Sequence, residues 1–150
     1  MPLIQEEDRK FLVDFFAKEL VEPVKMVYFT QHQSPLVVPS NVCMYCKETG
    51  ELLEEVSSLS DKIEVEVHDL LKDESLAQEY GVEKIPAVVI TGKNKGKIRF
   101  FGIPSGYEFA SLIEVIKDVS KGGSDLTEAT RTELGKVTSP VHIQVFVTPT

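Results

Sequence analysis

Two short, almost purely apolar segments constrain the fold of this chain more than any other feature. They are VKMVYF at residues 24–29 and IPAVVI at residues 85–90. Apolar runs of this length, without the alternation of a half-exposed strand, are typical of strands buried on both faces of a sheet. Such burial requires helices above and below the sheet, so the sequence predicts an α/β fold.

The other elements follow from periodicity and from turn residues. Two further strands are expected at IEVEVHD (63–69), which alternates apolar and polar residues, and at KIRFF (97–101), which follows the turn GKNKGK. Apolar residues recur at helical spacing in four segments, at residues 8–20, 46–59, 73–80 and 106–120. A strand–helix–strand crossover followed by a hairpin and a helix predicts a four-stranded mixed sheet with helices on both faces.

Length and charge narrow the class of protein. The chain has 150 residues, of which 42% are hydrophobic, and its formal net charge is -8. This charge disfavours nucleic acid or an anionic membrane surface as a partner. The opening MPLIQEEDRK has no basic region followed by an apolar stretch, and no apolar run reaches membrane-spanning length. We therefore expect a cytoplasmic protein that binds neither nucleic acid nor a membrane.

The motif CMYC carries the only two cysteines, Cys43 and Cys46, at the start of an expected helix. Cytoplasmic thiols are kept reduced, which favours a catalytic or metal-binding role for such a close pair. Backbone N–H groups at a helix N-terminus stabilise a thiolate, the form that attacks a disulfide. We expect Cys43 to be the nucleophile and Cys46 the resolving thiol, with Met44 and Tyr45 covering the site.

A metal site is the alternative for this pair. Structural zinc takes four ligands, whereas this chain offers two cysteines and three histidines without the usual paired spacing. An iron–sulfur cluster shared between two subunits, as in some glutaredoxins, is a second metal alternative. The ligand count disfavours zinc, while the iron–sulfur alternative stays open. We expect the protein to need no cofactor of its own.

The element order, the CxxC motif and the segment KIPAVVI together resemble the thioredoxin fold. In that fold a cis-proline lies beside the CxxC motif, and the backbone before it pairs with the substrate as a short strand. The resemblance therefore implies a cis peptide bond before Pro86 and substrate binding by the backbone of Ile85. A proline at the start of a buried strand needs such a reason, because it cannot donate a ladder hydrogen bond.

A closer resemblance covers nearly the whole chain. The segments FFGIPSGYEFASLIEVIKDVS and VHIQVFVTPT are similar to the protein disulfide oxidoreductases of thermophiles, glutaredoxin-like proteins with two thioredoxin units. The resemblance implies one unit at residues 1–122 and the first helix and strand of an incomplete second unit at residues 123–150. It also implies disulfide-containing protein substrates, and electrons from a thioredoxin-reductase-like flavoprotein. The competing function is a non-catalytic scaffold or binding module.

Residues 124–150 raise a separate expectation. We expect a helix with Ser124 as its N-cap, followed by an apolar strand at PVHIQVFV (140–147). In the family, VFVTPT leads directly into a second cysteine, so we expect either a fragment or a UGA selenocysteine codon read as a stop. A strand without neighbours seeks a partner. We expect residues 124–150 to form a homodimer contact or to be disordered, and docking of this segment on its own first unit would contradict this expectation.

Overall fold

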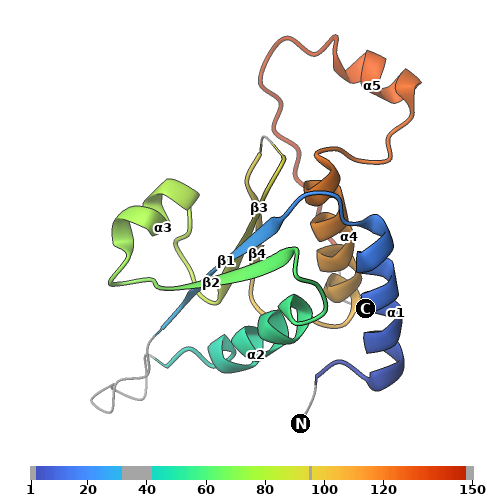
Figure 1. Cartoon of the computed structure of the whole chain (residues 1–150). Helices are drawn as coiled ribbons and strands as arrows, with labels where there is room; N and C mark the ends of the chain where they lie inside the picture. The colour runs from blue at the N-terminus through green and yellow to red at the C-terminus, as the bar shows by residue number, and fades with distance from the viewer. Residues whose placement is uncertain (1–2, 32–41, 95, 148–150) are drawn as a thin grey trace.

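The computed structural model describes residues 3–31, 42–94 and 96–147 (Figure 1). The expected loop between the first strand and Cys43 therefore lies mostly outside the described residues. The helices are α1 (Glu6–Glu19), α2 (Cys46–Ser57), α3 (Glu74–Tyr80), α4 (Tyr107–Lys121) and α5 (Glu128–Leu134), and the strands are β1 (Val24–Thr30), β2 (Ile63–Asp69), β3 (Ala87–Thr91) and β4 (Ile98–Phe101).

The strands form one four-stranded mixed sheet in the order β2-β1-β3-β4. β1 and β2 are parallel, with Val24 opposite Ile63. β3 is antiparallel to both β1 and β4. The predicted crossover and hairpin are thus both confirmed, and the two most apolar strands lie at the centre of the sheet, where both faces are covered.

Each face of the sheet has its own core. On one face, Met26, Tyr28, Val88 and Ile90 pack with buried residues of α1, α2 and α4. On the other face, a smaller cluster joins residues of β1 and β3 with Ala77 of α3 and Val82. Successive residues of a strand point to opposite faces, so the short apolar runs of β1 and β3 supply both cores at once.

Ser120 near the end of α4 anchors the segment that leads into β1. Its buried hydroxyl accepts hydrogen bonds from the N–H groups of Val21 and Glu22, at 2.9 and 3.0 Å. The same hydroxyl donates to the carbonyl oxygen of Glu22 at 2.6 Å. The amino end of β1 is therefore fixed to the carboxyl end of α4.

The segment after α4 differs from the expectation in two respects. The N-cap of α5 is Thr127, not Ser124, and the Thr127 hydroxyl accepts a hydrogen bond from the N–H of Thr130. The expected strand is not formed at residues 140–147, whose side chains are exposed. A strand needs a neighbour for its backbone groups, and no described strand pairs with this segment. Within the described residues, the segment does not dock on the first unit as a packed element.

Candidate active site

Cys43 and Cys46 form a disulfide where α2 begins. The sulfur atoms are 2.00 Å apart and the two Cα atoms 5.5 Å apart. Met44 and Tyr45 form the turn between them, and Cys46 is the first residue of α2. Cys46 is only 7% exposed, whereas Cys43 is half-buried. A partner arriving from solvent therefore meets Cys43 first.

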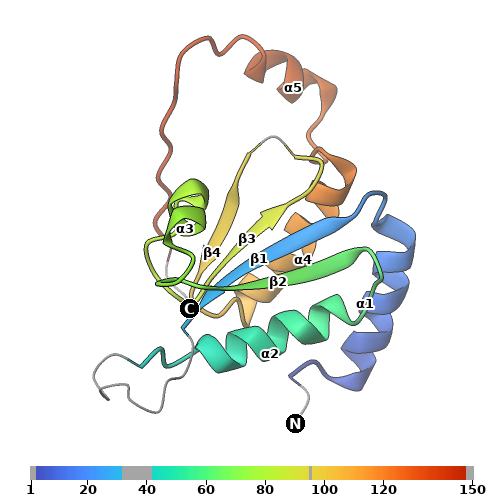
Figure 2. The same cartoon turned by 60° about the vertical axis from the view of Figure 1, so that its left-hand side comes forward.

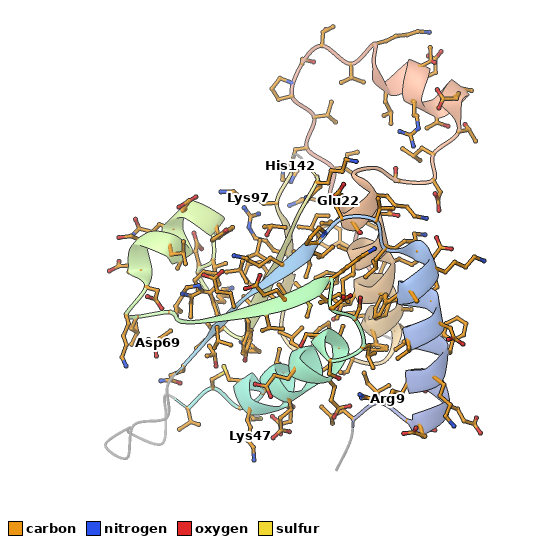
Figure 3. The ribbon with its side chains drawn as sticks, viewed as in Figure 1. Arg9, Glu22, Lys47, Asp69, Lys97 and His142 are labelled. Carbon is orange, nitrogen blue, oxygen red and sulfur yellow. A yellow bond between two sulfur atoms is a disulfide. The ribbon has the colours of Figure 1, made fainter. Side chains whose placement is uncertain are left out.

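The start of α2 provides the local electrostatics of the pair. Tyr45 is the N-cap and has no side-chain capping bond. The first intrahelical bond runs from the N–H of Thr49 to the carbonyl oxygen of Tyr45, at 2.9 Å. The N–H groups of the three residues between them precede that bond, and such groups stabilise a negative charge nearby. Lys47 adds little, because its side chain points into solvent (Figure 3).

Two side chains at the end of β1 hold the CxxC turn. The carbonyl oxygen of the Gln31 side chain accepts a hydrogen bond from the N–H of Cys43 at 3.0 Å. The Tyr28 hydroxyl, which is buried, donates to the carbonyl oxygen of Cys46 at 2.5 Å. Gly50 of α2 lies beside the Tyr28 ring, since a Cβ at this position would be 3.4 Å from it. Figure 2 shows α2 starting at the end of the sheet where β1 finishes.

The sequence interpretation did not include Tyr28 or Gln31 in the site. Tyr28 carried a usable signal, because it is the only residue of VKMVYF that combines an aromatic ring with a hydrogen-bonding tip. A buried tyrosine hydroxyl usually finds a partner. Gln31 lies in the polar run TQHQ, in which nothing distinguishes one residue from the next.

The peptide bond between Ile85 and Pro86 is cis, as the thioredoxin resemblance implied. Pro86 precedes β3, and its carbonyl oxygen accepts a hydrogen bond from the N–H of Gly102 at 2.8 Å. Ile85 lies outside the β3 ladder, whose pairing with β1 ends at Ala87. Ile85 lines a shallow cavity of about 260 Å³, which is also lined by Thr30, Gln31, Asp69, Leu70 and Leu71. Because Gln31 also bonds Cys43, this cavity lies beside the disulfide.

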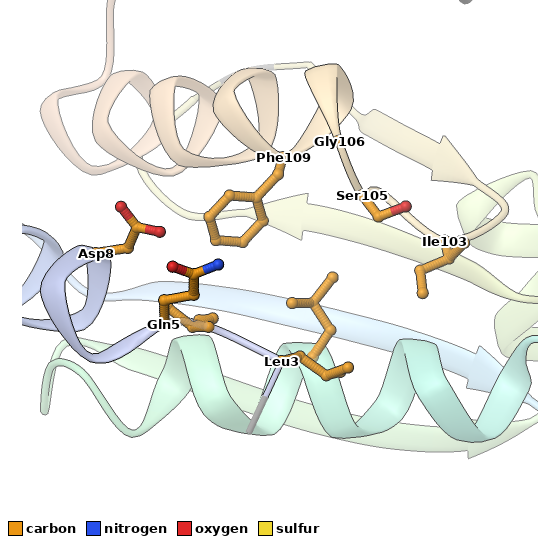
Figure 4. Close-up of a pocket in the computed structure, with 9 residues that line it drawn as sticks. Leu3, Gln5, Asp8, Ile103, Ser105, Gly106 and Phe109 are labelled. Atoms are coloured by element: carbon orange, nitrogen blue, oxygen red, sulfur yellow. The ribbon is translucent and has the colours of Figure 1, made fainter. Parts of the chain in front are cut away.

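A second cavity, of about 330 Å³, lies between the N-terminal segment, α2 and the start of α4 (Figure 4). Its lining includes Leu3, Gln5, Asp8 and Phe109, and neither cysteine contributes to it. Across residues 3–31, 42–94 and 96–147, no group of three or more His, Cys, Asp or Glu side chains is arranged to hold a metal ion. The same residues contain no helix with the length and apolarity needed to span a membrane.

A family model for the thioredoxin domain matches residues 36–114, which is more than half of the chain. The chain belongs to the thioredoxin family. A probable thioredoxin of Methanothermobacter thermautotrophicus is 39% identical over 83 residues, which are 55% of this chain and 89% of that protein. A thioredoxin of Methanocaldococcus jannaschii is 32% identical over 79 residues, which are 52% of this chain and 85% of that protein.

Two solved structures extend the thioredoxin-family similarity beyond the matched domain. A protein disulfide oxidoreductase from Aeropyrum pernix has a TM-score of 0.71 at 27% identity, covering 88% of this chain. The AhpF component of an alkylhydroperoxide reductase from Enterococcus faecalis has a TM-score of 0.71 at 26% identity, covering 87% of this chain. This chain spans 54% and 59% of those two chains. The thioredoxin fold, the CxxC disulfide and these relatives together support a thiol–disulfide oxidoreductase, as predicted from the sequence.

Proposed function

We propose that this protein exchanges disulfides with protein substrates through Cys43 as the nucleophile and Cys46 as the resolving thiol. The observation that carries the assignment is the difference in access, since Cys43 is half-buried and Cys46 is nearly buried in the first turn of α2. The position of the pair at a helix N-terminus supports a reactive thiolate.

In the reducing direction, the Cys43 thiolate attacks one sulfur of a substrate disulfide. A mixed disulfide forms and the other substrate sulfur leaves as a thiolate, which takes up a proton. The Cys46 thiolate then attacks the Cys43 sulfur, closing the internal disulfide and releasing the second substrate thiol. Two electrons pass from the cysteine pair to the substrate, and the opposite sequence oxidises a substrate dithiol.

Four residues are proposed to contact the substrate. Met44 is 75% exposed and Tyr45 is 51% exposed, so both offer apolar surface next to the disulfide. Among the described residues no hydrogen bond uses the backbone of Ile85, which leaves its N–H and C=O groups available to an extended substrate. Pro86 shapes the same edge, and the cavity beside Ile85 would receive a substrate side chain.

The partners are proposals that follow from this chemistry. Disulfide-containing proteins would be the substrates, and a thioredoxin-reductase-like flavoprotein would supply electrons. The occurrence of a similar fold within a component of an alkylhydroperoxide reductase supports a reductase as partner. We also propose a cytoplasmic location, which the net charge of -8 and the pair of cysteines suit.

We further propose that one thioredoxin unit ends at residue 122 and that residues 123–150 begin a second unit. Gly122 ends α4 in the left-handed conformation, with φ at 76°, and the helix that follows is short and exposed. Exposed apolar side chains at Val141, Ile143 and Val145 support a contact with another chain, and hence a homodimer.

The experiment that tests the cysteine roles uses a small disulfide-bonded protein, such as insulin, as the substrate. We expect the full chain to accelerate insulin reduction by dithiothreitol, and Cys43→Ser to abolish this. Cys46→Ser is expected to accumulate a mixed disulfide between Cys43 and insulin, visible by mass. An adduct in Cys43→Ser and none in Cys46→Ser would reverse the assignment. No acceleration by the wild type would reject the proposed function.

A further inference from the structure

Two hydrogen bonds, one from β1 and one from the residue that follows it, reach opposite ends of the CxxC turn. The Gln31 side chain accepts from the N–H of Cys43, and the Tyr28 hydroxyl donates to the carbonyl oxygen of Cys46. Tyr28 is 2% exposed, and burial raises the pKa of its hydroxyl, which therefore remains a hydrogen-bond donor at neutral pH. Both cysteines are thus tied through their backbone groups to side chains of β1 or of the residue directly after it.

Chain connectivity alone does not place Cys43 over the sheet. Gln31 and Cys43 are 12 positions apart in the sequence. The free energy of closing a connection changes only slowly with its length. The position of the turn relative to β1 therefore depends on local contacts, of which these two hydrogen bonds act directly on the cysteine backbone.

We propose that Tyr28 and Gln31 are positioning residues that keep Cys46 within reach of the Cys43 sulfur and so favour the internal disulfide over a mixed disulfide. Without the two bonds, the reduced turn samples more conformations, and the effective concentration of Cys46 at Cys43 falls. This inference rests on the proposed exchange function, since it concerns the resolving step at the same site.

Glutathione buffers measure that effective concentration directly. Oxidised glutathione first forms a mixed disulfide with Cys43 and releases one reduced glutathione. Cys46 then displaces the second glutathione, so that the two cysteines lose two electrons and two protons in all, which one oxidised glutathione takes up. The ratio of internal to mixed disulfide, multiplied by the concentration of reduced glutathione, is the effective concentration of Cys46.

The test compares three variants of the full chain with the wild type. Tyr28→Phe removes only the hydroxyl and keeps the buried ring, and Gln31→Met keeps the length of the side chain without its hydrogen-bonding groups. Ser120→Ala is the matched control, because it removes a buried hydroxyl bonded to backbone at the opposite end of β1. Each protein is equilibrated with glutathione, quenched in acid, alkylated and weighed by mass spectrometry.

We expect the effective concentration of Cys46 to fall about 3- to 10-fold in Tyr28→Phe and in Gln31→Met, the scale of one hydrogen bond. A fall of that size raises the redox potential of the pair by about 15 to 30 mV. Ser120→Ala is expected to lower the melting temperature and leave the effective concentration unchanged. This contrast separates positioning from a general loss of stability.

Four results would overturn the inference in whole or in part. Values within twofold of the wild type in both variants would show that the bonds do not position the pair, and a change in one variant alone would remove the role of the other residue. An equal fall in Ser120→Ala would attribute the effect to stability. If the wild type forms no reversible internal disulfide, the proposed function fails and this inference fails with it, which is distinguishable from unaffected variants of an active wild type.

Discussion

Reduction of the Cys43–Cys46 disulfide is expected to lower the free energy of unfolding by about 2 kcal/mol. The bond joins residues separated by three positions, so it closes a very small loop in the unfolded chain. The chain-entropy relation for a loop of about four residues gives about 6 cal/mol/K, which is about 1.9 kcal/mol at 298 K. For a chain of this length, the loss corresponds to a fall in melting temperature of roughly 4–8 °C.

The assay is urea denaturation of the oxidised protein and of the protein held in dithiothreitol, followed by circular dichroism. The variant with both Cys43→Ala and Cys46→Ala is the control, and its stability should not respond to dithiothreitol. Equal stability of the two wild-type forms, or greater stability of the reduced form, would refute the loop-entropy reasoning. Native-state interactions of the free thiols would then outweigh the constraint on the unfolded chain.

Two further predictions concern charge and packing. Hydrogen bonds from Lys25 first, and then from His68, hold the pKa of Glu66 below its usual range. Because the folded-state pKa is depressed, ionised Glu66 stabilises the fold at pH values above the unfolded-state pKa of about 4.3. Glu66→Gln should therefore lower the free energy of unfolding at pH 7. The difference in this free energy between wild type and variant should disappear as the pH falls through the folded-state pKa. Urea denaturation at several pH values checks this against Glu83→Gln, an exposed control, and a difference independent of pH would contradict it. Leu53→Ala empties a fully buried site on α2 and should cost about 2.7–5 kcal/mol in urea denaturation, whereas a loss under about 1 kcal/mol would show that the core collapses around the gap.

The sheet could be predicted from the sequence because the composition of its two central strands indicates that they are buried. VKMVYF and IPAVVI are apolar on both faces, and the structure places them at the centre. Burial at the edges of the elements was harder to predict. The hydrophobic periodicity of a strand or helix does not show where the element that covers it ends. Val67 is exposed although it continues the apolar face of β2. Phe11 likewise shares a helical stripe with buried residues yet is 67% exposed.

The cysteine pair could be recognised from its spacing and from its place before a helix. The contacts that hold the pair could not, because Tyr28 and Gln31 are distant from Cys46 and Cys43 in sequence, and only the folded sheet brings their side chains to the turn. The strand expected at 140–147 failed for a related reason. Its sequence pattern is suited to a strand, but strand formation depends on a neighbour that a local pattern does not specify.

The hydrogen bonds from Val21 and Glu22 to Ser120 can form only late in synthesis, after α4 has been made. The partners are separated by 98 and 99 positions, so the amino end of β1 emerges long before the residue that fixes it. At roughly 5–20 residues per second, that interval lasts about 5–20 seconds. In the last part of that interval, after β3 has been made, Val88 and Ile90 lack the cover that α4 later provides. The nascent domain therefore exposes part of its apolar core until its last helix is made.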